Sequence, residues 1–87
     1  YTEQEKTKIA RNYLLPRQIE ENGLKPEDLQ ISDQVLAKII RNYTREAGLR
    51  NLEREIGNIC RKVARQVVEG GKGPFRITLK QLNKLLG

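Results

Sequence analysis

The sequence contains no histidine, tryptophan or methionine, and Cys60 is its single cysteine. Without histidine, neither a Ser-His-Asp triad nor a Cys-His pair can form, which excludes nucleophilic catalysis of these kinds. One cysteine cannot close an internal disulfide, and without histidine it cannot complete a conventional zinc cluster. Cys60 also falls on the apolar face of a predicted helix, where a thiol is usually a small core hydrophobe. We therefore predict no catalytic residue and no metal site in this chain, and an intracellular, reducing compartment.

Aromatic residues and long apolar runs are scarce too. Tyr1, Tyr13, Tyr43 and Phe75 are the only aromatics, so the core must be built from Leu, Ile and Val. No apolar run suggests a signal peptide or a membrane span, and we expect no membrane contact. The 87 residues suffice for one small domain, 1–87, of modest stability. Because the chain does not begin with methionine, we expect it to be a fragment of a longer protein.

Charge is abundant and biased toward the basic side. The 17 Lys and Arg residues exceed the 11 Asp and Glu residues, which gives a net charge of +6 and a pI near 9.8. This excess favours contact with nucleic acid or an acidic surface. Many small domains are basic for solubility alone, so the charge by itself leaves the partner open.

The pattern predicts the order helix, helix, strand, helix, helix, strand, helix. Thr2 and Glu5 form a capping box, and Ile9, Tyr13 and Leu14 repeat at helical spacing up to Pro16, which should interrupt or restart the helix. A second short helix, 15–22, should end at Gly23, and Pro26–Asp28 should turn into a strand at 29–31. The fold class is therefore mostly α, a small bundle of helices with a short pair of strands.

Two longer amphipathic helices follow. Ser32 should cap a helix that runs toward Gly48, and the next helix should span 49–69. The residues predicted to form the buried stripe of that second helix are Leu49, Leu52, Ile56, Ile59, Cys60, Val63 and Val67. A glycine loop, a strand at 75–77 and a helix capped by Thr78 and Gln81 complete the chain. The loop departs from a Walker A sequence, because Gly73 follows Lys72 and Gln66 stands at the upstream glycine position.

Cations gather on one side of each long helix. At about 100° per residue, Lys38, Arg41 and Arg45 fall within about 60° of one another, and so do Arg50, Arg54, Arg61 and Arg65. Such rows suit the sequence-independent binding of a phosphate backbone. They also suit the ordinary solvated face of an amphipathic helix, and both interpretations stay open.

Arg50 is placed unusually, in the first turn of a helix directly after Gly48-Leu49. A cation there opposes the helix macrodipole, at a cost of about 0.3–1 kcal/mol. Two interpretations stay open for Arg50. It is either a surface arginine paired with Glu46 or Glu53, or its guanidinium binds phosphates held by another part of a larger protein.

Two segments of the chain resemble a known family. YTEQEKTKIARNYLLPRQIEENGL (1–24) and IIRNYTREAGLRNLEREIGNICRKVA (39–64) are similar to the small helical subdomain, or lid, of the AAA+ ATPase module in Lon proteases. The resemblance implies a lid with a short pair of parallel strands. It also implies that Gly48-Leu49-Arg50 is the family's sensor-2 motif, G-x-R, so that Arg50 would reach nucleotide phosphates.

The resemblance further implies a hexameric, ATP-dependent serine protease, cytoplasmic in bacteria or in the mitochondrial matrix of eukaryotes. The parent chain would also contain a large ATPase subdomain, which would bind most of the ATP and Mg²⁺, and a separate protease domain. This fragment alone should therefore be inactive. Some Lon proteases bind DNA. Nonspecific duplex DNA is therefore an expected partner of the basic residues above. The alternative is a stand-alone DNA-binding or protein-interaction module.

Overall fold

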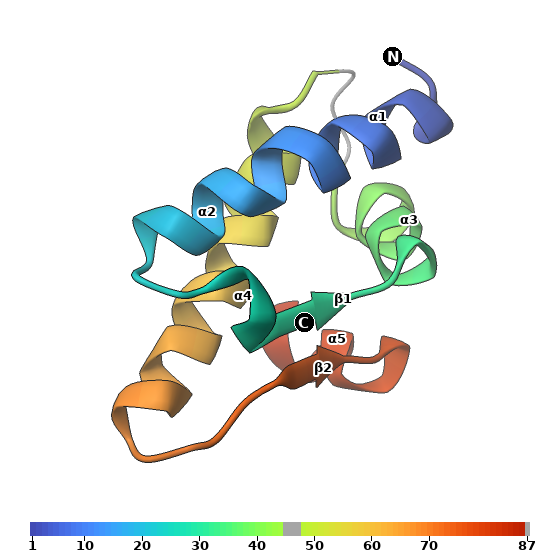
Figure 1. Cartoon of the computed structure of the whole chain (residues 1–87). Helices are drawn as coiled ribbons and strands as arrows, with labels where there is room; N and C mark the ends of the chain where they lie inside the picture. Colours follow the sequence, from blue (N-terminus) through green and yellow to red (C-terminus); the bar gives the residue numbers. More distant parts are fainter. Residues whose placement is uncertain (45–47, 87) are drawn as a thin grey trace.

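Helices make up most of the chain, and two short strands lie between them (Figure 1). The computed structural model describes residues 1–44 and 48–86. Its elements are α1 (Glu3–Ile9), the π-helical turn η1 (Ala10–Leu14), α2 (Leu15–Glu21), the 3-10 turn η2 (Pro26–Asp28), β1 (Leu29–Ile31), α3 (Asp33–Tyr43), α4 (Arg50–Val68), β2 (Phe75–Ile77) and α5 (Leu79–Leu86). This is the predicted order and the predicted fold class.

The first three elements form one unbroken helical rod (Figure 1). Its start is the predicted capping box, in which the Glu5 amide donates to Thr2 Oγ1 at 3.1 Å and the Thr2 amide donates to Glu5 Oε1 at 3.0 Å. Of the two effects predicted for Pro16, the structure shows the restart: α-helical bonding resumes at Leu15, and the rod continues without a break. The Leu15 amide donates back to the carbonyl of Ala10, which makes the turn wider than an α-helical one. A wide turn relieves the clash between a proline ring and the preceding turn.

The two strands form a parallel pair in the register Leu29↔Phe75, Gln30↔Arg76 and Ile31↔Ile77. Each strand leads directly into a capped helix, as predicted. Ser32 Oγ accepts from the Val35 amide at 3.2 Å, and Thr78 and Gln81 form a reciprocal capping box. The two caps place the first turns of α3 and α5 at the same end of the strand pair.

The helix that begins after Ser32 is shorter than predicted. α3 ends at Tyr43, and Thr44 is extended, with φ −128° and ψ 137°. The buried Thr44 hydroxyl donates to the carbonyl of Ile40 at 2.8 Å, which ties off the last turn. Arg45 was grouped with Lys38 and Arg41 on the assumption that one helix carries all three, but α3 ends at Tyr43. Arg45 itself lies outside the described residues.

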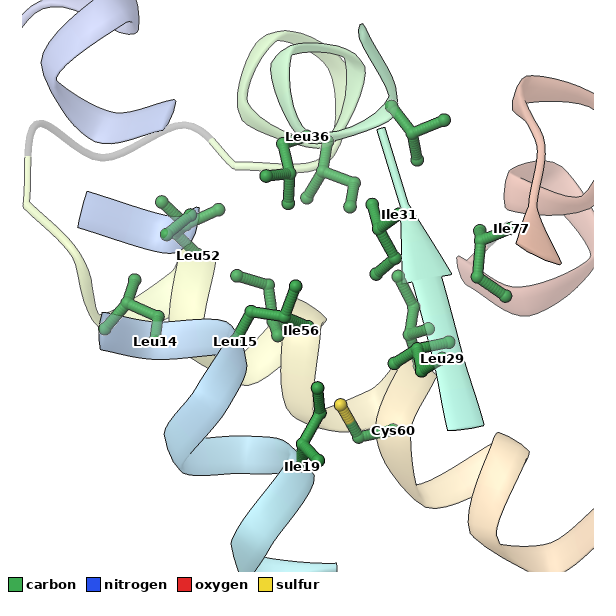
Figure 2. Close-up of a cluster of buried hydrophobic side chains, with 14 of the residues drawn as sticks. Leu14, Leu15, Ile19, Leu29, Ile31, Leu36, Leu52, Ile56, Cys60 and Ile77 are labelled. Atoms are coloured by element: carbon green, nitrogen blue, oxygen red, sulfur yellow. The ribbon is translucent and has the colours of Figure 1, made fainter. Parts of the chain in front are cut away.

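One apolar core joins the rod, the strands and the other helices (Figure 2). Leu14, Leu15 and Ile19 of the rod face Ile56 and Cys60 of α4 across it (Figure 2). The fully enclosed side chains include Leu36, Ile39, Leu52, Ile56, Ile59 and Cys60, each 0% exposed. The aliphatic core predicted from the scarcity of aromatics is confirmed.

Two residues predicted on apolar faces are exposed instead, one strongly and one partly. Tyr13 is 65% exposed, because the π-helical turn shifts the helical phase and directs Leu14 and Leu15 inward in its place. Val67 is 38% exposed, and the last turn of α4, where it lies, extends past the end of α2 (Figure 1). Leu49, at the other end of the predicted stripe, is half-buried and packs against the core.

Within residues 1–44 and 48–86, no helix combines the length and the apolar content that crossing a bilayer would take.

Candidate functional site

The first turn of α4 carries Arg50 at its first helical position. Leu49 precedes it as the N-cap and offers no side-chain hydrogen bond to the free amides of that turn. Arg50 is exposed, and among the described residues it forms no ion pair. The predicted position of this arginine, in the first turn of a long helix, is confirmed.

Arg50 lines a groove between α2 and α4, which we call the α2/α4 groove. Its volume is about 510 Å³. The residues that line it are Gln18, Glu21 and Asn22 on the α2 side and Arg50, Glu53, Arg54, Gly57, Asn58 and Arg61 on the α4 side. Three arginines therefore share one groove with two glutamates, which leaves a basic surface open to solvent.

The glutamates of this groove are held by residues of α2. Glu53 Oε2 accepts from Arg17 Nη1 at 3.1 Å and from Gln18 Nε2 at 3.2 Å. Gln18 Nε2 also donates to Glu21 Oε2 at 3.2 Å. Pairing of Arg50 with Glu53, one of the alternatives that the sequence left open, is therefore not found, because α2 packs beside α4 and Arg17 pairs with that carboxylate. The other partner considered, Glu46, lies outside the described residues.

The other two arginines of the groove bond to neutral amides one turn earlier on the same helix. Arg54 Nη2 donates to Asn51 Oδ1 at 2.5 Å, and Arg61 Nη2 donates to Asn58 Oδ1 at 2.8 Å. An amide oxygen orients a guanidinium without neutralising it. The positive charge of Arg50, Arg54 and Arg61 is therefore available to an anion.

The remaining predicted cations lie elsewhere. Arg65 is exposed and pairs with Glu69 at 3.3 Å, one turn further along α4 and outside the groove lining. Lys38 and Arg41 line a different groove, between α3 and α5, and Arg41 Nη2 pairs with Glu3 Oε1 at 2.8 Å. The structure thus brings three of the seven predicted DNA-binding residues together, Arg50, Arg54 and Arg61. It places Lys38 and Arg41 in a second group.

The α3/α5 groove contains one cation, Lys80, that grouping residues by their angle around a single helix did not predict. Lys80, from the first turn of α5, lines it together with Lys38 and Arg41. Lys80 also lines the adjoining groove at the strand ends, with Arg76. A signal was present in the sequence, because no acidic residue follows Glu69 while Lys72, Arg76, Lys80 and Lys84 all do.

Cys60 is a core residue, as predicted. Its side chain is fully enclosed between α4 and the rod (Figure 2). Burial raises the pKa of the Cys60 thiol to about 12, which disfavours the reactive thiolate. Among the described residues, no group of three or more His, Cys, Asp and Glu side chains could hold a metal ion.

Known proteins resemble this chain closely. Residues 20–75 match the family model described as Lon protease AAA+ ATPase lid domain. Over all 87 residues, the chain is 67% identical to a Lon protease of Lawsonia intracellularis, 61% identical to a Lon protease of Desulfatibacillum aliphaticivorans and 56% identical to Lon protease 2 of Thermus thermophilus. It covers 10%, 10% and 11% of these proteins, respectively. The chain thus spans about a tenth of the length of the curated relatives it matches.

Proposed function

This chain belongs to the family of Lon protease AAA+ ATPase lid domains, and we propose that it is the nucleotide-sensing lid of an ATP-dependent protease. In this proposal the guanidinium of Arg50 meets the phosphates of a nucleotide bound by the large ATPase subdomain of the same chain. Movement of the lid then couples ATP binding and hydrolysis to the unfolding and degradation of protein substrates.

The observation that supports the proposal is the exposed guanidinium of Arg50 at the start of α4, which has no ion-pair partner among the described residues. Glu53, one turn away, is engaged by Arg17. A guanidinium can hold two phosphate oxygens at once, and such charge-assisted bonds are about twice as strong as neutral ones. The placement of Arg50 opposes the helix dipole, so an external anion gives that placement a physical reason.

The rest of the machinery is proposed to lie outside these 87 residues. ATP would be held mainly by the large subdomain, where Mg²⁺ supplies charge neutralisation at the phosphates. Peptide cleavage would take place in a protease domain of serine type, and the assembled protein would be a cytoplasmic hexamer. The isolated chain is then expected to hydrolyse neither ATP nor peptides.

The test is the ATPase activity of a full-length protein that carries this chain. Arg50→Ala should lower kcat/KM for ATP by at least about tenfold, the value of one lost hydrogen bond to a charged group. Arg54→Ala is the matched control, because it removes the next arginine of the same groove. An equal effect of the two variants, or none from Arg50→Ala, would contradict the sensing role.

A second candidate function, nonspecific binding of duplex DNA, is favoured by the α2/α4 groove. Arg54 and Arg61 are exposed and bonded only to neutral amides in the described structure, so both can pair with phosphates. Binding of this kind should weaken steeply between about 50 and 200 mM salt, with a slope of about −0.9 for each phosphate contacted.

The DNA hypothesis is tested by titrating the isolated chain with a random-sequence duplex. Arg54→Gln and Arg61→Gln should each reduce the salt slope by about one unit. Arg65→Gln is the control, because Arg65 already pairs with Glu69 outside the groove. No binding at low salt would exclude this function.

A further inference from the structure

The groove between α3 and α5 is basic on both of its sides. Lys38 and Arg41 line it from α3, and Lys80 lines it from α5. Its volume is about 580 Å³, and none of the described residues that line it is Asp or Glu. In the described part of the chain, Lys38 and Lys80 form no ion pair, while Arg41 pairs with Glu3. Within the described residues, the groove therefore presents a positive potential that is neutralised only at Arg41.

Apolar and amide groups lie between these cations. Leu79, in the first turn of α5, is 45% exposed although it is a large hydrophobic residue, and Ala37 adds further apolar surface beside it. Gln34 and Asn83 line the same groove and can pair with a peptide backbone. Asn83 Oδ1 accepts from the Tyr43 hydroxyl at 2.6 Å, so its Nδ2 donor is left for another partner.

The groove is held open by fixed elements. The Tyr43–Asn83 hydrogen bond joins α3 to α5, and Leu82 of α5 is buried in the core. On the other side of α5, Lys62 of α4 donates to the carbonyl of Leu85. Because both walls are anchored, a ligand would meet a largely preformed surface and lose less free energy to ordering.

We propose that the α3/α5 groove is a docking site for an acidic peptide segment that carries an apolar residue between its carboxylates. The carboxylates pair with Lys38 and Lys80 on the two sides, and the apolar side chain packs on Leu79. Charge complementarity favours an acidic ligand. The exposed leucine favours a peptide over a nucleic acid backbone, because that backbone carries no apolar side chain to pack on it. The proposal does not depend on the role of Arg50.

The groove continues past Lys80 toward the ends of the strands. Gln34, Leu79 and Lys80 also line the adjoining groove, where Arg76 of β2 adds another exposed cation. Arg76 has no ion pair among the residues that the structure describes, and no acidic residue lines this second groove either. A bound segment could therefore run from Lys38 to Arg76 with carboxylates along its length.

The experiment is a fluorescence-anisotropy titration of the 87-residue chain with a labelled synthetic peptide in which glutamates flank one leucine. Lys38→Glu and Lys80→Glu should each weaken binding about fivefold or more at low ionic strength. Lys72→Glu makes the same charge change in the loop before β2, outside both grooves, and should leave binding within about twofold. Leu79→Ser, and a peptide with serine in place of leucine, should each weaken binding without altering its salt dependence.

Three results would overturn the proposal. The first is no binding of the glutamate-leucine peptide in about 50 mM salt, where exposed charges are least screened. The second is an equal weakening of peptide binding by Lys72→Glu and Lys80→Glu, which would show that the peptide responds only to the net charge of the chain. The third is tighter binding of a random-sequence DNA duplex that Lys38→Glu and Lys80→Glu abolish, which would assign the groove to nucleic acid. Circular dichroism of each variant establishes that it is folded.

Discussion

Gln18 of α2 lies across Gly57 of α4 so closely that a Cβ on Gly57 would come within 2.7 Å of Gln18 Oε1. The same Gln18 side chain donates to both glutamates of the α2/α4 groove. Gly57 therefore gives Gln18 the space in which it holds Glu21 and Glu53 on the α2 side. This arrangement keeps the carboxylates occupied and the arginines of the groove available.

The stability of Gly57→Ala should depend on Gln18. Alanine gains about 1 kcal/mol over glycine in a helix interior. In the natural background this gain should be largely cancelled, because Gln18 must move and lose hydrogen bonds worth about 0.5–1.5 kcal/mol each. In a Gln18→Ala background the full gain should appear. Urea denaturation of the four proteins of this double-mutant cycle measures the coupling. The same gain in both backgrounds would show that Gln18 moves aside freely.

Truncation of two valines one turn apart on α4 should change the free energy of unfolding by different amounts. Val63 is 1% exposed and Val67 is 38% exposed. Val63→Ala should lower the free energy of unfolding by about 2 kcal/mol, through lost burial and the cavity left behind. Val67→Ala should change it by less than about 0.5 kcal/mol. Equal losses, measured by chemical denaturation, would mean that the end of α4 is covered in solution.

The Glu3–Arg41 pair makes stability depend on pH in the acid range. The hydrogen bond from Arg41 lowers the pKa of Glu3 below 4.5. The folded state therefore binds this proton less readily than the unfolded state, and the contribution is present above pH 4.5 and lost as pH falls through the folded-state pKa. Glu3→Gln should be less stable than the natural chain at about pH 6, and the difference should be smaller at about pH 3. Because the pair is exposed, the difference should also shrink in high salt.

A control variant separates this pair from general acid effects. Glu27→Gln removes an exposed glutamate of η2 that has no ion pair in the described structure. Its free energy of unfolding should follow that of the natural chain at both pH values. A pH dependence of Glu3→Gln identical to that of the natural chain would show that the Glu3–Arg41 contact does not contribute to stability.

Cys60 should be unreactive in the folded chain. Because burial raises the pKa of its thiol to about 12, a disulfide reagent at about pH 8 should label it only as the protein unfolds. In denaturant, labelling should be rapid and complete. The raised pKa also means that stability falls above about pH 9, where the unfolded thiol ionises and the folded one does not. Rapid labelling of the native chain would contradict the enclosed position.

Local signals predicted most of the fold. Thr2, Ser32 and Thr78 each begin a helix because a hydroxyl placed before an apolar pattern satisfies a free backbone amide, and this chemistry needs only neighbouring residues. The strands at Leu29 and Phe75 and the core face of α4 up to Val63 were likewise readable. The failures at Tyr13 and Val67 were not local, because a π-helical turn and a helix end that extends past its neighbour depend on what packs nearby.

The sequence by itself determined the helical domain, its aliphatic core, the family resemblance and the place of Arg50 in the first turn of α4. Periodicity, capping and composition act over a few residues, so they can be read without coordinates. Only the tertiary structure decided the partners of the charges. It joined Glu53 to Arg17 and Glu3 to Arg41, and it placed Lys80 beside Lys38. These pairs come from different elements, and only the packing of α2 on α4 and of α1 and α5 on α3 brings them within reach. Arg50 was left without an ion pair among the described residues for the same reason.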